Sequence, residues 1–164
     1  MSKLVLILSL AVTFSAQLRA QETVVYLVRH AEKETNPQDP RDPGLSPIGF
    51  ERAMNLDDSL KAIKFDAVYS SDYKRTVATA QPVATRNDLV IIKYDPSAPS
   101  KLVEEVNSRW KGKTVLIVGH SNTLLPLIEA FGGKATMQHI DDNDYSNIFR
   151  LQIGEHVTLS EKKF

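Results

Sequence analysis

The stretch that most clearly indicates the fold class is "TVLIVGHSNTLLPLIEA", residues 114–130. Its four apolar residues Val115–Val118 predict a strand that is covered on both faces of a sheet. The residues that follow predict a helix that begins at a Ser121 or Asn122 cap and ends at Gly132 and Gly133. A buried strand that leads through a polar turn into a helix is typical of a parallel α/β sheet.

The same alternation extends on both sides of this stretch. Strands are predicted at residues 23–28, 65–71 and 89–94, helices at 47–63, 72–86 and 101–110, a Pro-rich loop at 34–44 and a terminal hairpin at 146–162. We expect Ser46 to cap the first of these helices and Ser71 or Asp72 to open the second. The pattern predicts a three-layer α/β/α sandwich with a mostly parallel central sheet and antiparallel edge strands from the tail.

The first 20 residues differ from the rest of the chain. Lys3 precedes an apolar run from Leu4 to Phe14, and small and polar residues follow. This run is short for a membrane-spanning helix and resembles a secretory signal, with cleavage expected after Ala20. We therefore expect a signal peptide at residues 1–20, a single domain at 21–164, and export to a periplasm or the cell exterior. A buried N-terminal element and an uncleaved anchor are the alternatives.

The charge and the composition exclude several classes of protein. The full chain has no net charge, and removal of residues 1–20 would leave a net charge of −2, so a broad cationic surface for nucleic acid is not expected. Nor is stable membrane association expected after signal cleavage. The chain has no cysteine, which excludes disulfides, thiol catalysis and thiolate metal ligands.

Polar residues of one chemical kind follow the predicted strands. Arg29 and His30 end the strand at 23–28, and His120 ends the strand at 114–119. Ligand sites of such sheets lie beyond the carboxyl ends of the strands, so both histidines are expected at one edge. Arg75, about one turn into the helix after a third strand, can point over the same edge. A single strand-end histidine is more often structural, but two of them with arginines favour a functional site.

The residue types indicate an anion rather than a metal ion. Guanidinium groups would repel a cation, and the chain has no His-x-x-His or Glu-x-x-His spacing. Arginine offers paired donors that match phosphate, and a neutral histidine beside it can act as a nucleophile. The loop that contains His139, Asp141, Asp142 and Asp144 is predicted to be a solvated acidic loop, with a divalent-ion site as the weaker alternative.

Four ordered blocks carry a resemblance to a known family. "VRHAEK", "LSPIG", "SSDYKRTVATA" and "VGHSN" resemble the histidine phosphatase superfamily, the branch that contains phosphoglycerate mutases and small phosphohistidine phosphatases. The resemblance implies a phosphoglycerate mutase-like fold, with residues 21–164 as the catalytic domain of a small phosphatase. It implies no cofactor and no metal, because the pocket supplies the positive charge.

The resemblance also implies roles for individual residues. His30 would be the nucleophile that forms a phosphohistidine, and Arg29, Arg75 and His120 would hold the phosphoryl oxygens. Asn36 matches an asparagine of the family motif and would also contact phosphate. The family usually supplies a proton donor between the helix arginine and the last histidine, and Asp95 is our candidate, with a turn-forming role as the alternative. Ala31 replaces the usual glycine after the nucleophile, as in some small members.

These observations predict an enzyme, a phosphatase of the phosphoric monoester hydrolase type, that acts on a phosphorylated small molecule or a phosphoprotein. If no proton donor is present, good leaving groups such as phosphohistidine, acyl phosphate or polyphosphate would be favoured. One alternative is a phosphate- or phosphoprotein-binding domain without turnover. Another is a mutase-type phosphotransferase, which the short chain and "GHSNT" disfavour.

Overall fold

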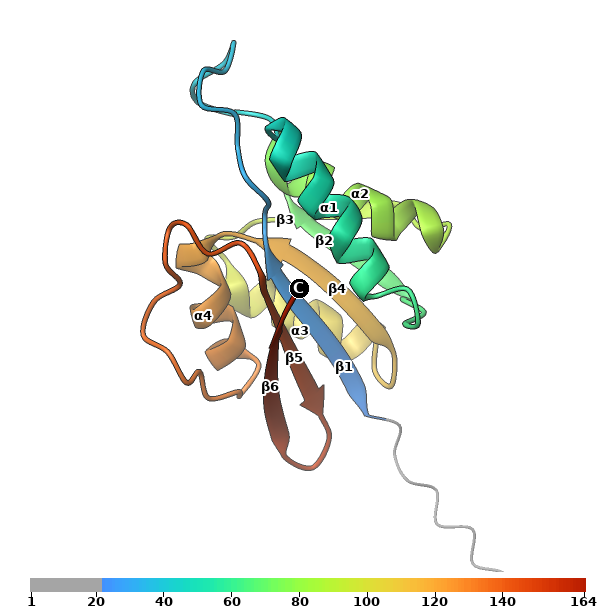
Figure 1. Ribbon diagram of the computed structural model, residues 1–164. Coiled ribbons are helices and arrows are strands. Elements are labelled where there is room, and N and C mark those ends of the chain that lie inside the picture. The colour runs from blue at the N-terminus through green and yellow to red at the C-terminus, as the bar shows by residue number, and fades with distance from the viewer. Residues whose placement is uncertain (1–21) are drawn as a thin grey trace, which may run out of the picture.

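The computed structural model describes residues 22–164, which form a six-stranded sheet covered by helices (Figure 1). The strand order is β3-β2-β4-β1-β5-β6. The strands are β1 (Thr23–Arg29), β2 (Ala67–Ser71), β3 (Ile91–Tyr94), β4 (Thr114–Gly119), β5 (Asn147–Ile153) and β6 (Val157–Lys163). The first four strands are parallel, and β5 and β6 run antiparallel to them, as the sequence pattern predicts.

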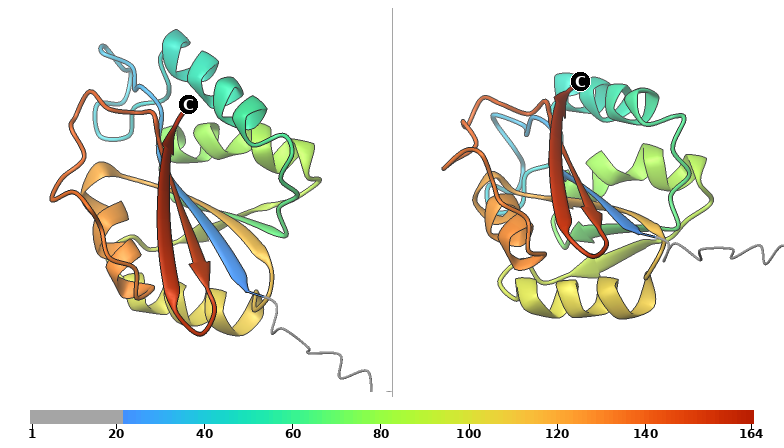
Figure 2. Two further views of the ribbon diagram at one scale, coloured as in Figure 1. Left: turned by 60° about the horizontal axis from the view of Figure 1, so that its bottom comes forward. Right: turned by 90° about the horizontal axis from the view of Figure 1, so that it is seen from below.

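The helices lie in two layers, one on each face of the sheet (Figure 2). On one face lie α1 (Pro47–Ser59) and α2 (Lys74–Arg86), and on the other α3 (Pro99–Arg109) and α4 (Ser121–Ala130). The three-layer sandwich is therefore confirmed. Its sheet is buried on both faces because β1 and β4 are apolar at consecutive positions and both sets of side chains meet a helix layer.

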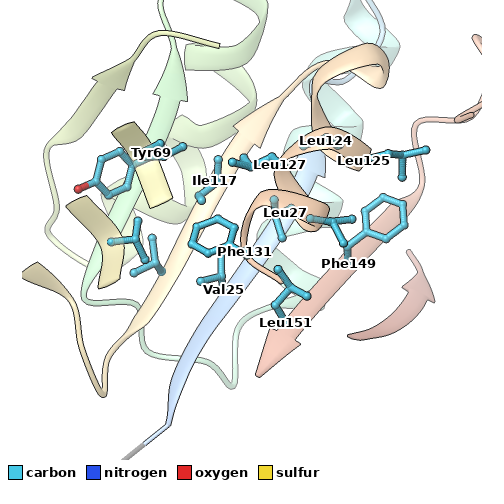
Figure 3. Packing of buried hydrophobic residues seen from close by; sticks show 14 of the residues in the cluster. Val25, Leu27, Tyr69, Ile117, Leu124, Leu125, Leu127, Phe131, Phe149 and Leu151 are labelled. Carbon is cyan, nitrogen blue, oxygen red and sulfur yellow. The ribbon is translucent and has the colours of Figure 1, made fainter. Parts of the chain in front are cut away.

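Each face of the sheet has its own apolar core. Val25 and Leu27 of β1 point to the α3–α4 side, where they join Ile117, Leu124 and Phe149 (Figure 3). The intervening residues of β1 point to the α1–α2 side and pack with Leu56, Val83 and their neighbours. This double burial fixes the direction of β1 and therefore the place where its last residues emerge.

The register of the central strands brings the two predicted strand ends together. Arg29 of β1 pairs with Gly119 of β4, and the backbone N–H of His30 donates a hydrogen bond of 2.9 Å to the Gly119 carbonyl. Because β5 runs antiparallel to β1, its first residue lies at this same carboxyl edge. The segment that precedes β5, residues 141–146, therefore also reaches this edge.

The structure corrects two predicted helix starts. Ser71 and Asp72 do not cap α2; its N-cap is Tyr73, and Asp42 of the Pro-rich loop accepts a hydrogen bond of 3.0 Å from the Lys74 N–H. The N-cap of α4 is His120, because the helix starts directly at Ser121. By contrast, the Ser46 cap of α1 is confirmed, since its hydroxyl accepts from the Gly49 N–H at 3.1 Å.

The predicted signal peptide, residues 1–20, lies outside the described residues. Within residues 22–164, none of the helices combines the length and the hydropathy that crossing a bilayer requires.

Candidate active site

Two buried histidines lie side by side at the carboxyl edge of the sheet. The His30 and His120 ring centroids are 5.3 Å apart, with the ring planes at 66°. The two residues are 6% and 9% exposed. Their nearness follows from the pairing of β1 with β4, which ends at the residues just before them.

The His30 ring is held through one nitrogen. Nδ1 lies 2.7 Å from the Ala31 carbonyl oxygen, which can only accept, so Nδ1 carries the proton. The lone pair is then on Nε2. Burial, followed by the positive charges of Arg75, His120 and Arg29, lowers the pKa of His30 to about 3. At neutral pH the ring is therefore an uncharged imidazole with a free Nε2 lone pair, which is the form that a nucleophile needs.

The His120 ring is held through the opposite nitrogen. Its Nε2 lies 2.8 Å from the hydroxyl of Ser71, the last residue of β2, which also bonds Thr76. The Thr123 N–H in the first turn of α4 donates to the His120 side chain. Burial and the charges of Arg75 and Arg29 lower the pKa of His120 to about 4. The two imidazoles thus differ in their partners: a backbone carbonyl holds His30, and the Ser71 hydroxyl and the start of α4 hold His120.

Close packing explains why residue 119, directly before His120, is a glycine. A Cβ on Gly119 would stand 2.7 Å from the Tyr94 hydroxyl and 3.2 Å from the Thr123 hydroxyl. The Thr123 hydroxyl accepts a hydrogen bond of 3.0 Å from the His120 N–H. A side chain at position 119 would therefore displace the groups that set the direction of His120.

Arg29 is fixed by the loop that precedes β5. Its Nη1 donates to the carbonyl oxygens of Asp141 and Asp142 at 2.9 Å and lies 3.2 Å from that of Asp144. The guanidinium stacks on the Tyr145 ring, 4.2 Å from its centroid. Nη2 lies 4.0 Å from the Asp142 carboxylate, and the side chain is only 8% exposed. The acidic loop therefore contacts the site through its carbonyl groups, which sequence reasoning missed.

Arg75 has fewer restraints. Its guanidinium lies 4.6 Å from the centroid of the Tyr73 ring, and Nη1 lies 3.6 Å from the Asp42 carboxylate, which is too far for a hydrogen bond. Within residues 22–164, Nη1 of Arg75 and Nε of Arg29 are buried and have no hydrogen-bond partner. A buried donor without an acceptor is costly, so these two atoms favour an anion beside the histidines.

The two tentative site residues have no described contact with this cluster. The side-chain hydrogen bonds described for Asp95 go to the backbone N–H and the hydroxyl of Ser97. These bonds lower the pKa of Asp95, which disfavours it as a proton donor at neutral pH. Asn36 is exposed in the Pro-rich loop. Both therefore stay predictions without a described contact to the histidines.

Three residues that sequence reasoning did not select complete the cluster. The Tyr73 ring is 5.0 Å from the His120 ring, and the Tyr145 ring is 6.1 Å from the His30 ring. Asp42 is the third. Because Tyr73 lies two residues before Arg75, the sequence could have predicted it near the site. Tyr145 and Asp42 reach the site only through long-range folding.

A metal site has little support in the described part of the chain. Among residues 22–164 no group of three or more His, Asp or Glu side chains is arranged to hold a metal ion. The arrangement instead combines a neutral nucleophile with guanidinium donors, which can bind a phosphoryl group and accept it covalently.

Comparison with known proteins gives a consistent result. The family model described as "Histidine phosphatase superfamily (branch 1)" matches residues 25–97. Phosphoserine phosphatase 1 of Hydrogenobacter thermophilus is 39% identical over 93 residues, which cover 54% of this chain and 42% of that protein. The chain thus spans less than half the length of the curated relative it matches.

Solved structures share the fold at low identity. YhfR of Bacillus stearothermophilus superposes with a TM-score of 0.67 at 20% identity, covering 86% of this chain and 96% of the other. The protein histidine phosphatase SixA complexed with tungstate superposes with a TM-score of 0.66 at 16% identity, covering 85% and 96%. These likenesses show the fold and leave the substrate open.

Proposed function

Because the chain belongs to the histidine phosphatase superfamily, we propose that it is a metal-independent phosphatase that works through a phosphohistidine at His30. Its substrates are phosphate esters or other phosphorylated compounds. The observation that carries the proposal is the pair of buried, unpartnered guanidinium atoms, Arg29 Nε and Arg75 Nη1, beside a neutral His30. Phosphoryl oxygens supply the acceptors that these donors lack.

The first step transfers the phosphoryl group to the enzyme. The Nε2 lone pair of His30 attacks phosphorus, the N–P bond forms, and the bond from phosphorus to the leaving group breaks. The Nδ1 proton stays on the ring, held by the Ala31 carbonyl at 2.7 Å. This bond stabilises the positive charge that the imidazole gains on phosphorylation, as a carbonyl partner does for an imidazolium.

The second step hydrolyses the phosphohistidine. Water attacks phosphorus, the N–P bond breaks, the electron pair returns to Nε2 of His30, and inorganic phosphate leaves with both protons of the water. Arg29 and Arg75 hold the equatorial oxygens in both steps, and the His120 ring lies beside His30. Such donors stabilise the charge of an in-line transition state without rearranging. The Ser71 hydroxyl donates to Thr76, so it accepts from Nε2 of His120, which fixes the ring beside the phosphoryl site.

The source of the leaving-group proton shapes the substrate range. Asp95 bonds to Ser97 and its pKa is lowered, and Asp42 faces a guanidinium at 3.6 Å. The lowered pKa of Asp95 disfavours a protonated carboxyl there at neutral pH. We therefore expect faster turnover of compounds whose leaving groups need no proton, such as phosphoramidates and acyl phosphates. A phosphoserine phosphatase among the relatives keeps phosphomonoesters in the range.

The decisive test compares the wild type with His30→Ala on p-nitrophenyl phosphate in the presence of EDTA. We expect hydrolysis by the wild type that EDTA does not reduce, and loss of at least about a thousandfold in the variant, because the nucleophile is gone. His156→Ala is the matched control, since His156 is exposed in the β5–β6 hairpin.

Other outcomes assign other functions. No hydrolysis by the wild type, together with binding of phosphate or vanadate, would make the chain a phosphate-binding domain. Transfer of the phosphoryl group to a second substrate in place of water would make it a mutase-type phosphotransferase. Equal rates for the wild type and His30→Ala would overturn the phosphohistidine mechanism.

A further inference from the structure

The two arginines of the site have the same pair of neighbours. Arg29 stacks on Tyr145 and has the Asp142 carboxylate 4.0 Å from Nη2. Arg75 stacks on Tyr73 and has the Asp42 carboxylate 3.6 Å from Nη1. A carboxylate and an aromatic ring therefore flank each side of the expected phosphoryl position. This repeated arrangement comes from four segments that are distant in the sequence.

The two carboxylates are accessible from solvent to different degrees. The Asp142 side chain is 95% exposed, and that of Asp42 is 30% exposed. Asp42 is held by the Lys74 N–H at 3.0 Å, so it has a fixed place at the start of α2. Neither carboxylate makes a hydrogen bond with the arginine it faces, so each keeps acceptor capacity for another group.

Nearby ionic groups are already paired with one another. In the described part of the chain, Arg41 lies 3.7 Å from Asp39, Glu32 accepts from Arg52, and Lys93 bonds Asp72. The carboxylates that face the two site arginines are those of Asp142 and Asp42. The rim of the site is acidic and aromatic while its centre is cationic.

We propose that the site selects phosphoryl compounds whose leaving group carries an ammonium or quaternary ammonium group. An ammonium linked to the bridging oxygen through two carbons lies roughly 5 Å from phosphorus in an extended chain. Oxygens bound to Arg29 or Arg75 would place that ammonium within ion-pair range of Asp142 or Asp42.

The same rim disfavours anionic leaving groups. A carboxylate in the leaving group would meet Asp42 or Asp142, and like charges at this distance repel. Selection for cations thus separates amino-alcohol phosphates and related amines from phosphorylated hydroxy acids. This inference rests on the proposed phosphatase function and adds the charge of the leaving group to it.

The test uses two substrates of the same shape. Phosphocholine and its neutral carbon isostere, 3,3-dimethylbutyl phosphate, differ in one charge. The measured quantity is the ratio of their kcat/KM values in the wild type, Asp142→Asn, Asp42→Asn and the double variant. Because intrinsic reactivity of each substrate is the same with every enzyme, it cancels when the ratios are compared. Asp58→Asn, an equal charge change at an exposed position of α1, is the matched control.

We expect each single variant to lower the ratio by about three- to tenfold, and the double variant by more, since each exposed or half-exposed pair contributes modestly. High salt should reduce the wild-type ratio toward that of the double variant. Asp58→Asn should keep the wild-type ratio. A ratio that is the same in the wild type and the double variant would overturn the inference.

The proposed function is decided separately. Hydrolysis of p-nitrophenyl phosphate that depends on His30, with an unchanged substrate ratio, would refute the cation selectivity alone. If the wild type hydrolyses nothing, the dissociation constants of the same two compounds replace kcat/KM. Preference for phosphocholine that Asp142→Asn and Asp42→Asn remove would then support cation selection at a binding site, and equal affinities would refute it.

Discussion

The site has two halves that contain the same kinds of side chain but are held differently. The His30 half consists of His30, Arg29, Tyr145 and Asp142, and the His120 half consists of His120, Arg75, Tyr73 and Asp42. In the first half three carbonyl oxygens fix the guanidinium. In the second half the guanidinium has one ion pair at 3.6 Å and one ring beneath it.

The imidazoles differ in the same way. His30 is tied to the backbone carbonyl of the next residue, which has no rotational freedom of its own. His120 is tied to the Ser71 hydroxyl, a side-chain group that can rotate. The His30 half therefore holds its nucleophile in a fixed orientation. The His120 half can adjust as charge on the phosphoryl oxygens changes.

The largest expected difference between the halves concerns their arginines. Arg29→Ala should lower the free energy of unfolding by about 2–4 kcal/mol, because carbonyl oxygens at a buried position lose their donor. Arg75→Ala should lower it by about 1 kcal/mol or less, since its ion pair is long and partly exposed. Urea denaturation monitored by circular dichroism measures both values.

Arg29→Lys serves as the control, because lysine keeps the charge and can reach one carbonyl. It should recover part of the stability. Equal losses for Arg29→Ala and Arg75→Ala would show that the carbonyl contacts of Arg29 contribute nothing beyond those of an ordinary ion pair.

A second expected difference concerns acid. The pKa of His30 falls to about 3 in the folded chain, below its ordinary value of 6.5, so the unfolded chain takes up the proton first. Above pH 6.5, protonation of His30 therefore does not change the free energy of unfolding. This free energy decreases as the pH falls from 6.5 toward 3. Between pH 7 and pH 5 the wild type should lose about 1–2 kcal/mol more than His30→Gln.

His120→Gln should remove a nearly equal part of the loss between pH 7 and pH 5 and a smaller part below about pH 4, because the pKa of His120 falls only to about 4. Urea titrations at several pH values measure these slopes. His156→Gln, in the exposed hairpin, should keep the wild-type slope. A wild-type slope in His30→Gln would mean that His30 is charged in the folded chain, against its role as a neutral nucleophile.

The smallest expected difference tests the adjustable contact of His120. Ser71→Ala should lower kcat/KM for p-nitrophenyl phosphate by about three- to tenfold, because one hydrogen bond that sets the His120 ring is lost. Ser70→Ala is the matched control, since the buried Ser70 hydroxyl bonds the Ser71 carbonyl and not the ring. Similar effects of the two changes would point to β2 packing rather than to His120.

Much of the fold was open to sequence reasoning because its signals are local. The apolar runs at 24–28 and 115–118 predicted buried strands, and their polar ends predicted Arg29, His30 and His120 at one edge. The helix starts were less predictable. Ser71 follows the pattern of a cap, yet its hydroxyl bonds Thr76 and His120, and the cap of α2 comes from Asp42 in another loop.

The alternating strands and helices, and the four residues that indicate a phosphoryl site, could be predicted from the sequence. These residues are Arg29, His30, Arg75 and His120. Each rests on a periodicity or an adjacency that spans fewer than ten residues. The carbonyls that hold Arg29, the carboxylate that faces Arg75 and the group that holds each imidazole depend on the tertiary structure. Those partners are up to 115 residues apart in the chain, so only the packing of β5 and the two loops against the sheet edge brings them together.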